Sequence, residues 1–327
     1  MEVWETVELL RRERERRRLS LEEVARRAGW ANESIPRRLE RPTGNPTLAS
    51  LRRYAKALGV EIKVSVSGTR VISFFNHAGG VGKTSAARDM GYVLAQEGFE
   101  VLLIDGDPQA NLTSWMGIDG EVSREQTFYE SVIGGEEQRY LPEPLRANGM
   151  GLIPSSLDIA NLEPQLVGQI MGVTRLRSAV RNTSGYDFVL LDCPPSLGQL
   201  SALSVIASDY VVVPVATSIK GFQGIETVMK MIGDYRQATP GLRVAMFLLT
   251  HYDSRTRHDR DAREALTRDL SSIAPVSEPL AERPSPYKDA SLNGVPVPVH
   301  DPSGKAAAEI SSAVGTLLSA LKVEVNV

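Results

Sequence analysis

The sequence predicts an α/β fold with a doubly wound, mainly parallel sheet, preceded by a small all-α domain. From residue 71 onward, short apolar segments alternate with helical ones, whereas about sixty residues before that point form a series of short helices. Fully apolar strands separated by helices indicate a parallel sheet covered on both faces. A length of 327 residues exceeds what one hydrophobic core usually serves, which agrees with one large and one small domain.

The N-terminal region contains four predicted helices: Val7–Arg18, Leu21–Ala28, a third from Asn32 or Glu33 to Arg41, and Thr47–Leu58. Ser20 followed by Glu23 is a capping-box pattern that begins the second helix, and Gly29 ends it. Residues 60–66 then alternate between apolar and polar, and residues 67–69 form a short linker. We therefore expect domains at residues 1–66 and 70–327.

The second domain contains six predicted strands: Val71–Phe75, Val101–Ile104, Gly151–Pro154, Phe188–Leu191, Tyr210–Val215 and Val244–Thr250. The segment Ala86–Glu97 is a predicted helix between the first two strands. Ligands of such sheets bind at the carboxyl ends of the strands, so function is expected there.

The net charge of −3 hides an asymmetry along the chain. Residues 1–70 contain 16 Lys and Arg against 10 Asp and Glu, and the remainder contains 21 against 30. A basic end often marks a nucleic-acid-binding module. A solvated helix face is the alternative explanation of the same charges.

Several classes of protein are excluded by composition. The longest apolar runs, such as Ala245–Leu249, fall far short of the ~18 residues that a membrane-spanning helix needs. The charged segment Met1–Arg18 lacks the apolar stretch of a secretion signal, and the single Cys193 cannot form an intramolecular disulfide. We therefore expect a cytoplasmic protein.

The segment Gly79-Gly80-Val81-Gly82-Lys83-Thr84 lies between a predicted strand and a predicted helix, as in the phosphate-binding loop of a P-loop NTPase. Its backbone N–H groups and the helix N-terminus favour an anion, Lys83 reaches the outer phosphates, and the Thr84 hydroxyl ligates Mg²⁺. Asn76 or His77 stands where the motif usually has its first glycine. A purely structural glycine turn is the alternative, but it does not explain the Lys-Thr pair.

Two aspartates follow predicted strands. Asp107 lies in the sequence Asp105-Gly106-Asp107 after the second strand, and Asp192 directly follows Phe188–Leu191. At that edge of the sheet a carboxylate can hold the hydration shell of Mg²⁺. A helix cap or turn residue is the alternative role for either aspartate.

Five segments, in this order, resemble the ParA/MinD family of deviant Walker ATPases, specifically the ParA partition proteins: Asn76–Ser85, Val101–Thr113, Tyr186–Leu197, Asp209–Val215 and Leu249–Thr256. The resemblance runs from about Val71 to the C-terminal end of the chain. It implies a Mg²⁺-dependent ATPase that binds ATP or ADP and forms an ATP-dependent homodimer. It also implies non-specific DNA binding and stimulation by a ParB-type partner.

The family pattern assigns catalytic roles to Lys83, Asp107 and Asp192, with Asp107 positioning the attacking water. It assigns Mg²⁺ to Thr84, Asp107 and Asp192. The nucleotide-binding residues that it implies are Gly79, Gly80, Val81, Gly82, Lys83, Thr84, Ser85 and, against the adenine, Pro279. Arg255 and Arg283 stand where family members place DNA-binding basic residues, and solvated surface arginines are the alternative.

Ala78 departs from the family pattern. The family has there a signature lysine that crosses the dimer interface to the partner's phosphates, and alanine contributes no charge. An interfacial cation is worth several kcal/mol in the transition state. We therefore expect weak hydrolysis, or a substitute cation such as Lys220, or an engineered change at Ala78.

The N-terminal segments Ser20–Gly29, Asn45–Leu48 and Ala55–Val60 resemble the Cro/repressor-type helix-turn-helix family. In that motif Leu21, Val24 and Ala25 pack inward, and the third helix enters the major groove. The residues placed to contact DNA are Asn32, Ser34, Arg37 and Arg38. Pro36 and about one extra residue depart from the motif, and a helical bundle that only makes dimer contacts is the alternative.

Together these features predict a DNA segregation ATPase for chromosome or plasmid partition, associated with the nucleoid and able to repress its own operon. The alternative is a transcriptional regulator that uses ATP binding as a dimerisation switch, which Ala78 favours. A MinD-like membrane switch is disfavoured, because the tail Ala306–Val327 has one lysine and is not a basic amphipathic helix.

Overall fold

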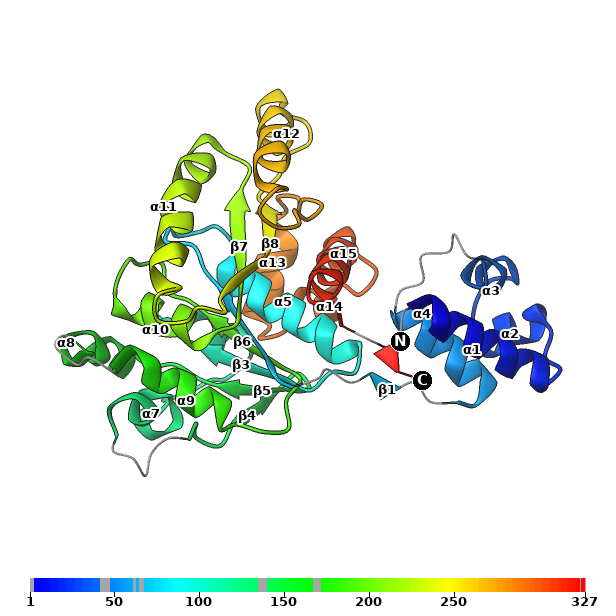
Figure 1. Ribbon diagram of the computed structural model, residues 1–327, viewed down its shortest axis with the longest axis horizontal. Coiled ribbons are helices and arrows are strands. Elements are labelled where there is room, and N and C mark those ends of the chain that lie inside the picture. Colours follow the sequence, from blue (N-terminus) through cyan, green and yellow to red (C-terminus); the bar gives the residue numbers. More distant parts are fainter. Residues whose placement is uncertain are drawn as a thin grey trace. The chain divides into compact units, whose positions relative to one another are not determined.

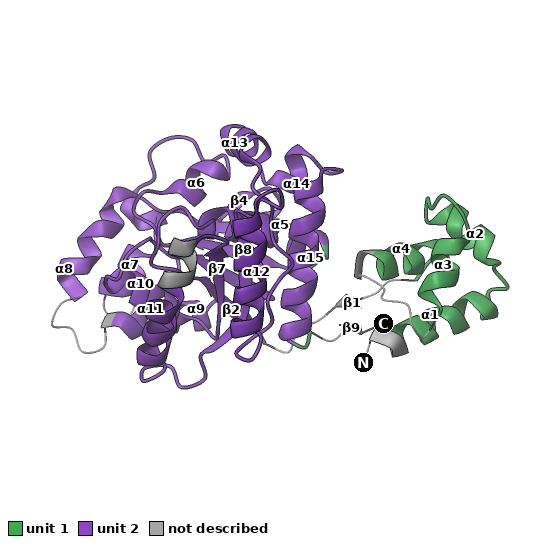
Figure 2. Ribbon diagram, turned by 90° about the horizontal axis from the view of Figure 1, so that it is seen from above, with its two compact units in different colours: residues 1–67, 97–99, 322–327 green, residues 68–96, 100–321 purple. Residues whose placement is uncertain are grey.

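The computed structural model describes residues 3–41, 48–60, 63–64, 68–134, 140–166, 172–323 and 325–326. These residues belong to two compact units, one of residues 1–67, 97–99 and 322–327 and one of residues 68–96 and 100–321 (Figure 2). The division lies close to the expected limits of 1–66 and 70–327. It differs in assigning two short segments, 97–99 and 322–327, to the smaller unit.

The smaller unit is built from four helices: α1 (Val3–Arg16), α2 (Leu21–Arg27), α3 (Ser34–Leu39) and α4 (Leu48–Leu58). Ser20 caps α2 by accepting a hydrogen bond from the backbone N–H of Glu23 at 3.1 Å, as the capping pattern predicts. Gly29 follows the helix with a φ of +66°, a conformation that glycine adopts without steric cost.

The core of this unit joins α1, α2 and α4. Val24 and Ala25 are buried as expected, while Leu21 is half-buried. Tyr54 of α4 stacks on Trp30, with the ring centroids 6.2 Å apart. The first helix begins four residues earlier than expected, and Thr47 lies outside the described residues. Two short strands, β1 (Lys63–Val64) and β9 (Val325–Asn326), pair antiparallel.

The larger unit contains a seven-stranded sheet in the order β4-β5-β3-β6-β2-β7-β8 (Figure 1). Its strands are β2 (Arg70–Phe74), β3 (Val101–Asp105), β4 (Leu145–Ala147), β5 (Met150–Ile153), β6 (Phe188–Asp192), β7 (Tyr210–Ala216) and β8 (Arg243–Thr250). In this described sheet only β4 is antiparallel to its neighbour. All six predicted strands are present, which confirms the mainly parallel sheet. The three-residue edge strand β4 was not predicted, because it lacks a clear apolar run.

The helices of this unit are α5 (Lys83–Gln96), α6 (Asn111–Trp115), α7 (Tyr129–Ile133), α8 (Leu162–Leu166), α9 (Arg175–Arg181), α10 (Gln199–Ala207), α11 (Ile219–Tyr235), α12 (Arg257–Leu270), α13 (Pro284–Leu292), α14 (Val297–His300) and α15 (Lys305–Ala320), with short 3₁₀ turns at 124–126, 157–161 and 172–174. Among the described residues, no helix is long and apolar enough to cross a lipid bilayer.

Helices cover both faces of the sheet, which makes it doubly wound. Val71 and Val211 point to one face, where α9, α10 and α11 pack. Leu103 and Leu190 point to the other face and meet α5 at Gly91. A Cβ on Gly91 would lie 2.9 Å from the Leu103 side chain, so glycine allows α5 to lie close to the sheet.

Candidate functional site

Strand register brings three predicted site segments together at the carboxyl ends of the central strands. Asp192 at the end of β6 pairs in register with Phe74 at the end of β2 and with Asp105 at the end of β3. The glycine-rich loop follows β2, and Asp107 follows β3. The predicted lysine and the two predicted aspartates therefore converge beside the central strand β6.

The loop between β2 and α5 is held by side chains that connect it to two further strands. Asn76 donates a hydrogen bond from its side-chain amide to the backbone oxygen of Pro214 in β7 at 2.8 Å. The Thr250 hydroxyl at the end of β8 donates to the backbone oxygen of Val81 at 3.0 Å. Gly80 and Gly82 have φ values of +70° and +86°, where side-chain-bearing residues are strained. The loop shape is therefore set by its glycines and by two neighbouring strands.

Lys83 is the first residue of α5, and its side chain turns back toward the glycine-rich loop. Its side-chain nitrogen donates a hydrogen bond to the backbone oxygen of Ala78 at 2.8 Å, and the residue is 6% exposed. Burial lowers the pKa of Lys83, whereas the nearby negative charge of Asp192 acts to raise it. A buried ammonium group over a glycine turn at a helix N-terminus is a site for an anion such as phosphate.

Asp192 is fully buried, and neither of its carboxyl oxygens accepts a well-formed hydrogen bond from the described residues. Burial raises the pKa of Asp192 well above its usual range, and the neighbouring Asp105 raises it further, while the Thr84 hydroxyl and Lys83 act in the opposite direction. An orphaned buried carboxylate is costly unless a cation compensates it. This carboxylate, close to the Thr84 hydroxyl, therefore fits the oxygen-ligand chemistry of Mg²⁺.

The part of the chain that the structure describes holds no cluster of three or more His, Cys, Asp or Glu residues suited to a metal ion. This is compatible with Mg²⁺, which in phosphate sites takes one or two carboxylates together with substrate phosphates. Asp192, Thr84 and Asp107 are the side chains available for that role.

Asp105 anchors the loop that carries Asp107, a role that the sequence did not indicate. Its carboxylate accepts hydrogen bonds from the backbone N–H of Thr113 at 2.8 Å, from the Thr113 hydroxyl at 2.7 Å and from the backbone N–H of Asp107 at 3.1 Å. Burial raises the pKa of Asp105 to about 6, although these hydrogen bonds oppose the rise. Asp107 itself is 6% exposed and accepts from the backbone N–H of Gln109 at 2.9 Å.

Gly106 allows this loop to touch strand β6. Its backbone N–H donates to the backbone oxygen of Asp192 at 3.0 Å. A Cβ at this position would lie 2.6 Å from that same oxygen and 3.0 Å from the Ser204 hydroxyl. The absence of a side chain at Gly106 therefore brings Asp107 and Asp192 to adjacent positions.

A cleft of about 400 Å³ lies between the first turns of α5 and the segment 280–288. The residues that line it are Gly82, Ser85, Ala86, Asp89, Met90, Thr250, His251, Leu280, Ala281, Glu282, Arg283, Pro284, Tyr287, Lys288 and Ile310. Its lining is mainly apolar, which suits a flat aromatic ring. Pro279 is half-buried and directly precedes the lining residue Leu280.

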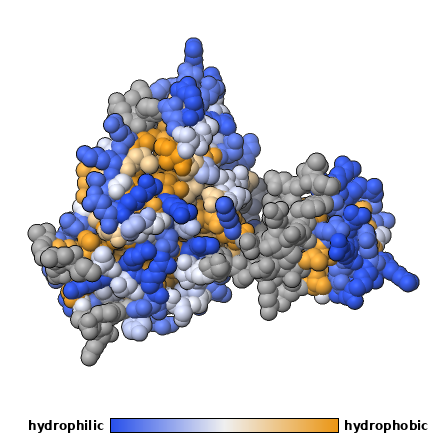
Figure 3. All heavy atoms as spheres, in the orientation of Figure 1, coloured by the Kyte–Doolittle hydropathy of each residue, from blue (hydrophilic) through white to orange (hydrophobic). Residues whose placement is uncertain are grey.

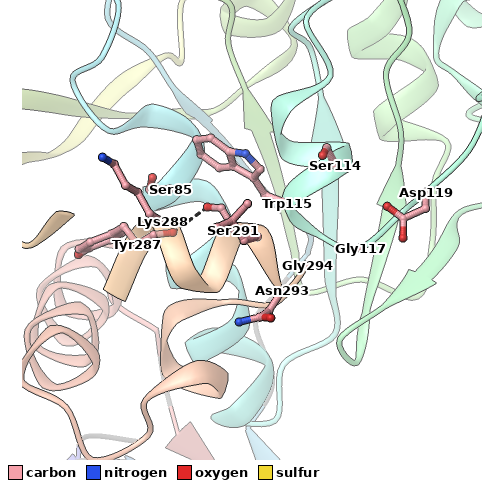
Figure 4. A pocket seen from close by; sticks show the side chains of 11 residues that line it. Ser85, Ser114, Trp115, Gly117, Asp119, Tyr287, Lys288, Ser291, Asn293 and Gly294 are labelled. Carbon is pink, nitrogen blue, oxygen red and sulfur yellow. Dashed lines mark hydrogen bonds between the residues drawn. The ribbon is translucent and has the colours of Figure 1, made fainter. Parts of the chain in front are cut away.

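A second cavity, of about 590 Å³, shares Ser85, Tyr287 and Lys288 with this cleft and lies between α6 and α13 (Figure 4). Trp115 of α6 faces it from one side. Helix α13 is therefore flanked by two cavities, one of which adjoins the glycine-rich loop.

The structure separates the two arginines that were assigned to DNA. Arg255 is 87% exposed at its side chain and pairs with Asp253 at 2.7 Å. Arg283 lines the cleft beside α5, and its guanidinium bonds to the Glu309 carboxylate at 2.7 Å. On the face that Figure 3 shows, hydrophilic residues cover α12, the helix that follows Arg255.

The four residues assigned to DNA in the smaller unit lie together at α3. Asn32 accepts a hydrogen bond from the backbone N–H of Ser34 at 2.9 Å, which satisfies one donor at the start of the helix. Arg37 pairs with Glu33 at 2.6 Å, and Arg38 is exposed. Pro36 is buried in the first turn, where a proline is tolerated.

These features define a class of protein: a P-loop nucleotide-binding domain joined to a helical unit of the helix-turn-helix kind. Residues 69–243 match the family described as an AAA domain, and residues 10–64 match the helix-turn-helix family. The chain belongs to the ParA/MinD-type family of P-loop ATPase domains, with a helix-turn-helix at its N-terminal side.

Known relatives agree with this assignment. The chain is 46% identical over 237 residues to a probable plasmid-partitioning protein ParA of Thermus thermophilus, a match that covers 70% of this chain and 72% of the relative. It is 30% identical over 245 residues to the sporulation initiation inhibitor protein Soj of Bacillus subtilis, covering 73% of this chain and 94% of Soj. Among such ParA and Soj homologues, the ParA proteins of Thermus thermophilus and Caulobacter vibrioides are named for plasmid and chromosome partition.

A solved structure resembles the larger unit. Cobyrinic acid a,c-diamide synthase from Mycobacterium smegmatis, crystallised with bound ADP and magnesium, superposes with a TM-score of 0.65 at 29% identity. The match covers 78% of this chain and 96% of that one. The nucleotide and the metal ion belong to that protein.

Proposed function

We propose that this chain is a Mg²⁺-dependent ATPase of DNA segregation, acting as an ATP-dependent homodimer that binds DNA non-specifically and is stimulated by a ParB-type partner. The observation that carries this proposal is the convergence of Lys83, Asp107 and Asp192 beside a glycine-rich loop and an apolar cleft. The partition homologues support the biological process.

Different residues would bind different parts of the nucleotide. The backbone of residues 79–85 and the ammonium group of Lys83 hold the phosphates, and the apolar cleft next to Leu280 receives the base. Thr84, Asp192 and Asp107 hold Mg²⁺, which when bound neutralises charge on the phosphates. The Asp107 carboxylate, fixed by the turn after β3, orients the attacking water.

Slow hydrolysis is part of the proposal. Ala78 has no charged side chain, and its backbone oxygen accepts the hydrogen bond of Lys83. The chain therefore lacks a cation at the position where the family supplies one across the dimer interface. Lys220 lies in α11, but its side chain is outside the described residues.

DNA contacts are proposed for both domains, residues 1–66 and 70–327. In the first, Asn32, Ser34, Arg37 and Arg38 at α3 would read an operator and allow repression of the chain's own operon. In the second, Arg255 is better placed for DNA than Arg283, because each pairs with a carboxylate but the Arg255 side chain is 87% exposed and that of Arg283 only 27%. The protein would act on the nucleoid in the cytoplasm.

A second function is favoured by one specific observation, the missing cation at Ala78. In that case the chain would be a transcriptional regulator whose larger unit dimerises on binding ATP without turning it over. The two functions share the nucleotide site and differ in hydrolysis.

The deciding experiment measures Mg-ATP binding by calorimetry and ATP turnover, with DNA and a ParB-like protein, for the chain and for Ala78→Lys. We expect tight binding in both and at least tenfold faster turnover in Ala78→Lys, because a lysine restores transition-state charge. Ala238→Lys is the matched control, since it adds the same charge at an exposed site before β8, away from the loop.

The outcomes separate the proposals. Turnover stimulated by DNA and partner supports the segregation ATPase, whereas binding without turnover, together with operator-specific DNA binding, supports the regulator. If the chain bound no Mg-ATP, both proposals would be refuted.

A further inference from the structure

Helix α5 carries an ion pair that is buried on all sides. Arg88 and Asp89 have side-chain exposures of 0% and 1%, and their atoms Nε and Oδ1 lie 2.7 Å apart. A second contact, from Nη2 to Oδ2, measures 3.3 Å. Burying such a pair generally stabilises a protein no better than apolar side chains of similar volume would. Its position five residues after Lys83 therefore calls for a reason other than stability.

The pair contacts three separate elements. Arg88 donates from Nη1 to the Ser291 hydroxyl of α13 at 2.9 Å, and its guanidinium lies over the Trp115 ring of α6, 5.6 Å from the centroid. Asp89 accepts a hydrogen bond from the backbone N–H of Val297 at 2.9 Å, where α14 begins. Arg88 thus links α6 and α13 through its planar guanidinium group.

One of these elements forms the wall of the base-sized cleft. Helix α13 contributes Tyr287 and Lys288 to that cleft, and Asp89 lines it as well. The Ser291 hydroxyl, which receives the hydrogen bond of Arg88, in turn donates to the backbone oxygen of Tyr287 at 2.8 Å. Any ligand that displaces Tyr287 therefore acts directly on the partner of Arg88.

The other element leads to Asp107. Helix α6 is anchored at Thr113 to the Asp105 carboxylate, and the turn of residues 107–110 directly precedes the helix. Within that turn the backbone N–H of Ala110 donates to the backbone oxygen of Asp107 at 2.9 Å. Trp115 and Asp107 are therefore connected through one short helix and the turn that precedes it.

The segments that follow α6 and α13 are in close contact, whereas a groove lies between the helices themselves. Beyond their ends, a Cβ on Gly294 would lie 2.6 Å from the Cα of Gly117, and Asn148 donates to the backbone oxygen of Gly294 at 3.2 Å. Between Trp115 and α13, by contrast, lies the cavity of about 590 Å³ (Figure 4). Its lining includes exposed Lys288 and Leu292, so it is an open groove along which α13 does not pack against α6.

We propose that Arg88 is a positioning residue that couples occupancy of the base-sized cleft to the placement of Asp107, with α13 and Trp115 as its two contacts. This inference rests on the proposed function, since it takes a nucleotide as the occupant of the cleft. The coupling requires that nucleotide bind one position of α13 better than another. Without the Arg88 side chain, nucleotide still binds in the cleft, but its binding no longer changes the position of α6.

Trp115 supplies a direct readout. The chain has three tryptophans, and Trp4→Phe with Trp30→Phe leaves Trp115 as the reporter. Mg-ADP is the probe, because it is not consumed. Binding is measured by calorimetry, and the response is the change in Trp115 emission at saturation. We expect a clear change in this parent protein.

The main variant is Arg88→Met with Asp89→Asn. It removes both charges together, so neither is left buried and unpaired, and asparagine keeps an acceptor for the N–H of Val297. Because Asp89 lines the cleft, the two proteins are compared at saturating Mg-ADP, and we expect the emission change to be reduced at least fivefold whatever the calorimetric affinity. A merely structural role would lower stability and affinity but leave the emission change at saturation unaltered.

Two single substitutions in α13 test the same coupling and perturb the fold less than the double variant does. Ser291→Ala removes one hydrogen bond of Arg88, and Ser285→Ala is the matched control on α13, since the hydroxyl of this exposed serine bonds to Asp289 at 2.7 Å and not to Arg88. We expect Ser291→Ala to reduce the emission change at least twofold and Ser285→Ala to leave it unchanged.

Two results would overturn the coupling. One is calorimetric binding to the parent with no change in Trp115 emission, and the other is an unaltered change in Ser291→Ala and in the double variant. Absence of calorimetric binding to the parent would overturn the proposed function and the coupling with it. The calorimetric signal distinguishes that outcome from a failure of the coupling alone.

Discussion

Replacing Gly106 by alanine tests how the candidate nucleotide site at the carboxyl ends of the strands is assembled. The added Cβ would lie 2.6 Å from the backbone oxygen of Asp192 and 3.0 Å from the Ser204 hydroxyl. The first of these atoms belongs to the central strand and cannot rotate away. The loop after β3 must therefore move, and Asp107 moves with it.

The expected loss of stability follows from these short distances. Inserting a methyl group into a packed interior typically costs about 1–3 kcal/mol, so we expect about 2 kcal/mol for Gly106→Ala. For a unit of this size, that free energy lowers the melting temperature by about 4–8 °C. Because Asp107 is displaced while the glycine-rich loop and Lys83 are not, ATP turnover should fall at least tenfold, a larger change than the one in Mg-ATP affinity.

The assay is thermal unfolding by calorimetry, followed by ATP binding and turnover. Gly315→Ala is the matched control, since a Cβ added at this position of α15 would meet no neighbouring element within 4 Å and alanine favours a helix. It should raise the melting temperature slightly and leave turnover unchanged. An unchanged melting temperature for Gly106→Ala would refute the account of Asp107 placement.

Three further predictions concern charge. The pKa of Asp105 is about 6 in the folded chain, above the ordinary value, so the folded state binds a proton that the unfolded state releases. The contribution of Asp105 to the unfolding free energy of the metal-free protein should therefore fall as the pH rises from about 4 to 6, and so should the difference in unfolding free energy between the parent and Asp105→Asn in urea denaturation. Lys83→Ala should weaken Mg-ATP binding in calorimetry by about 10–100-fold, because a charge-assisted contact to phosphate is lost; wild-type affinity in this variant would contradict the phosphate role. Arg38→Ala should weaken DNA binding and lower the slope of log affinity against log salt by about 1, whereas the same change at exposed Arg12 should not, as measured by fluorescence anisotropy.

Much of the site was predictable because its signals are local. A glycine-rich run between a strand and a helix, with Lys83 and Thr84 at the first helical turn, is recognisable within ten residues. Asp192 was found because it follows four apolar residues. In a parallel sheet such positions share one edge, so their proximity could be inferred without knowing the strand order.

Other features depend on residues that are distant in sequence. The hydrogen bond from Asn76 to Pro214 spans 138 residues and fixes the loop near its start. The sequence analysis noted Asn76 as a departure from the usual motif and as the start of a segment that resembles the family, but assigned it no role in orienting the loop. Arg283 could not be separated from Arg255 by sequence either, because its partner Glu309 lies 26 residues away on another helix.

The sequence alone determined that a phosphate-binding loop, two strand-end aspartates and an N-terminal helical unit are present, because burial periods and turn residues are encoded within a few neighbouring positions. Only the tertiary structure decided that Asp105 anchors the Asp107 loop and that Arg88 of α5 meets Ser291, 203 residues further along the chain. Such contacts depend on strand register and helix packing, which arise from the simultaneous burial of many apolar side chains rather than from any local pattern.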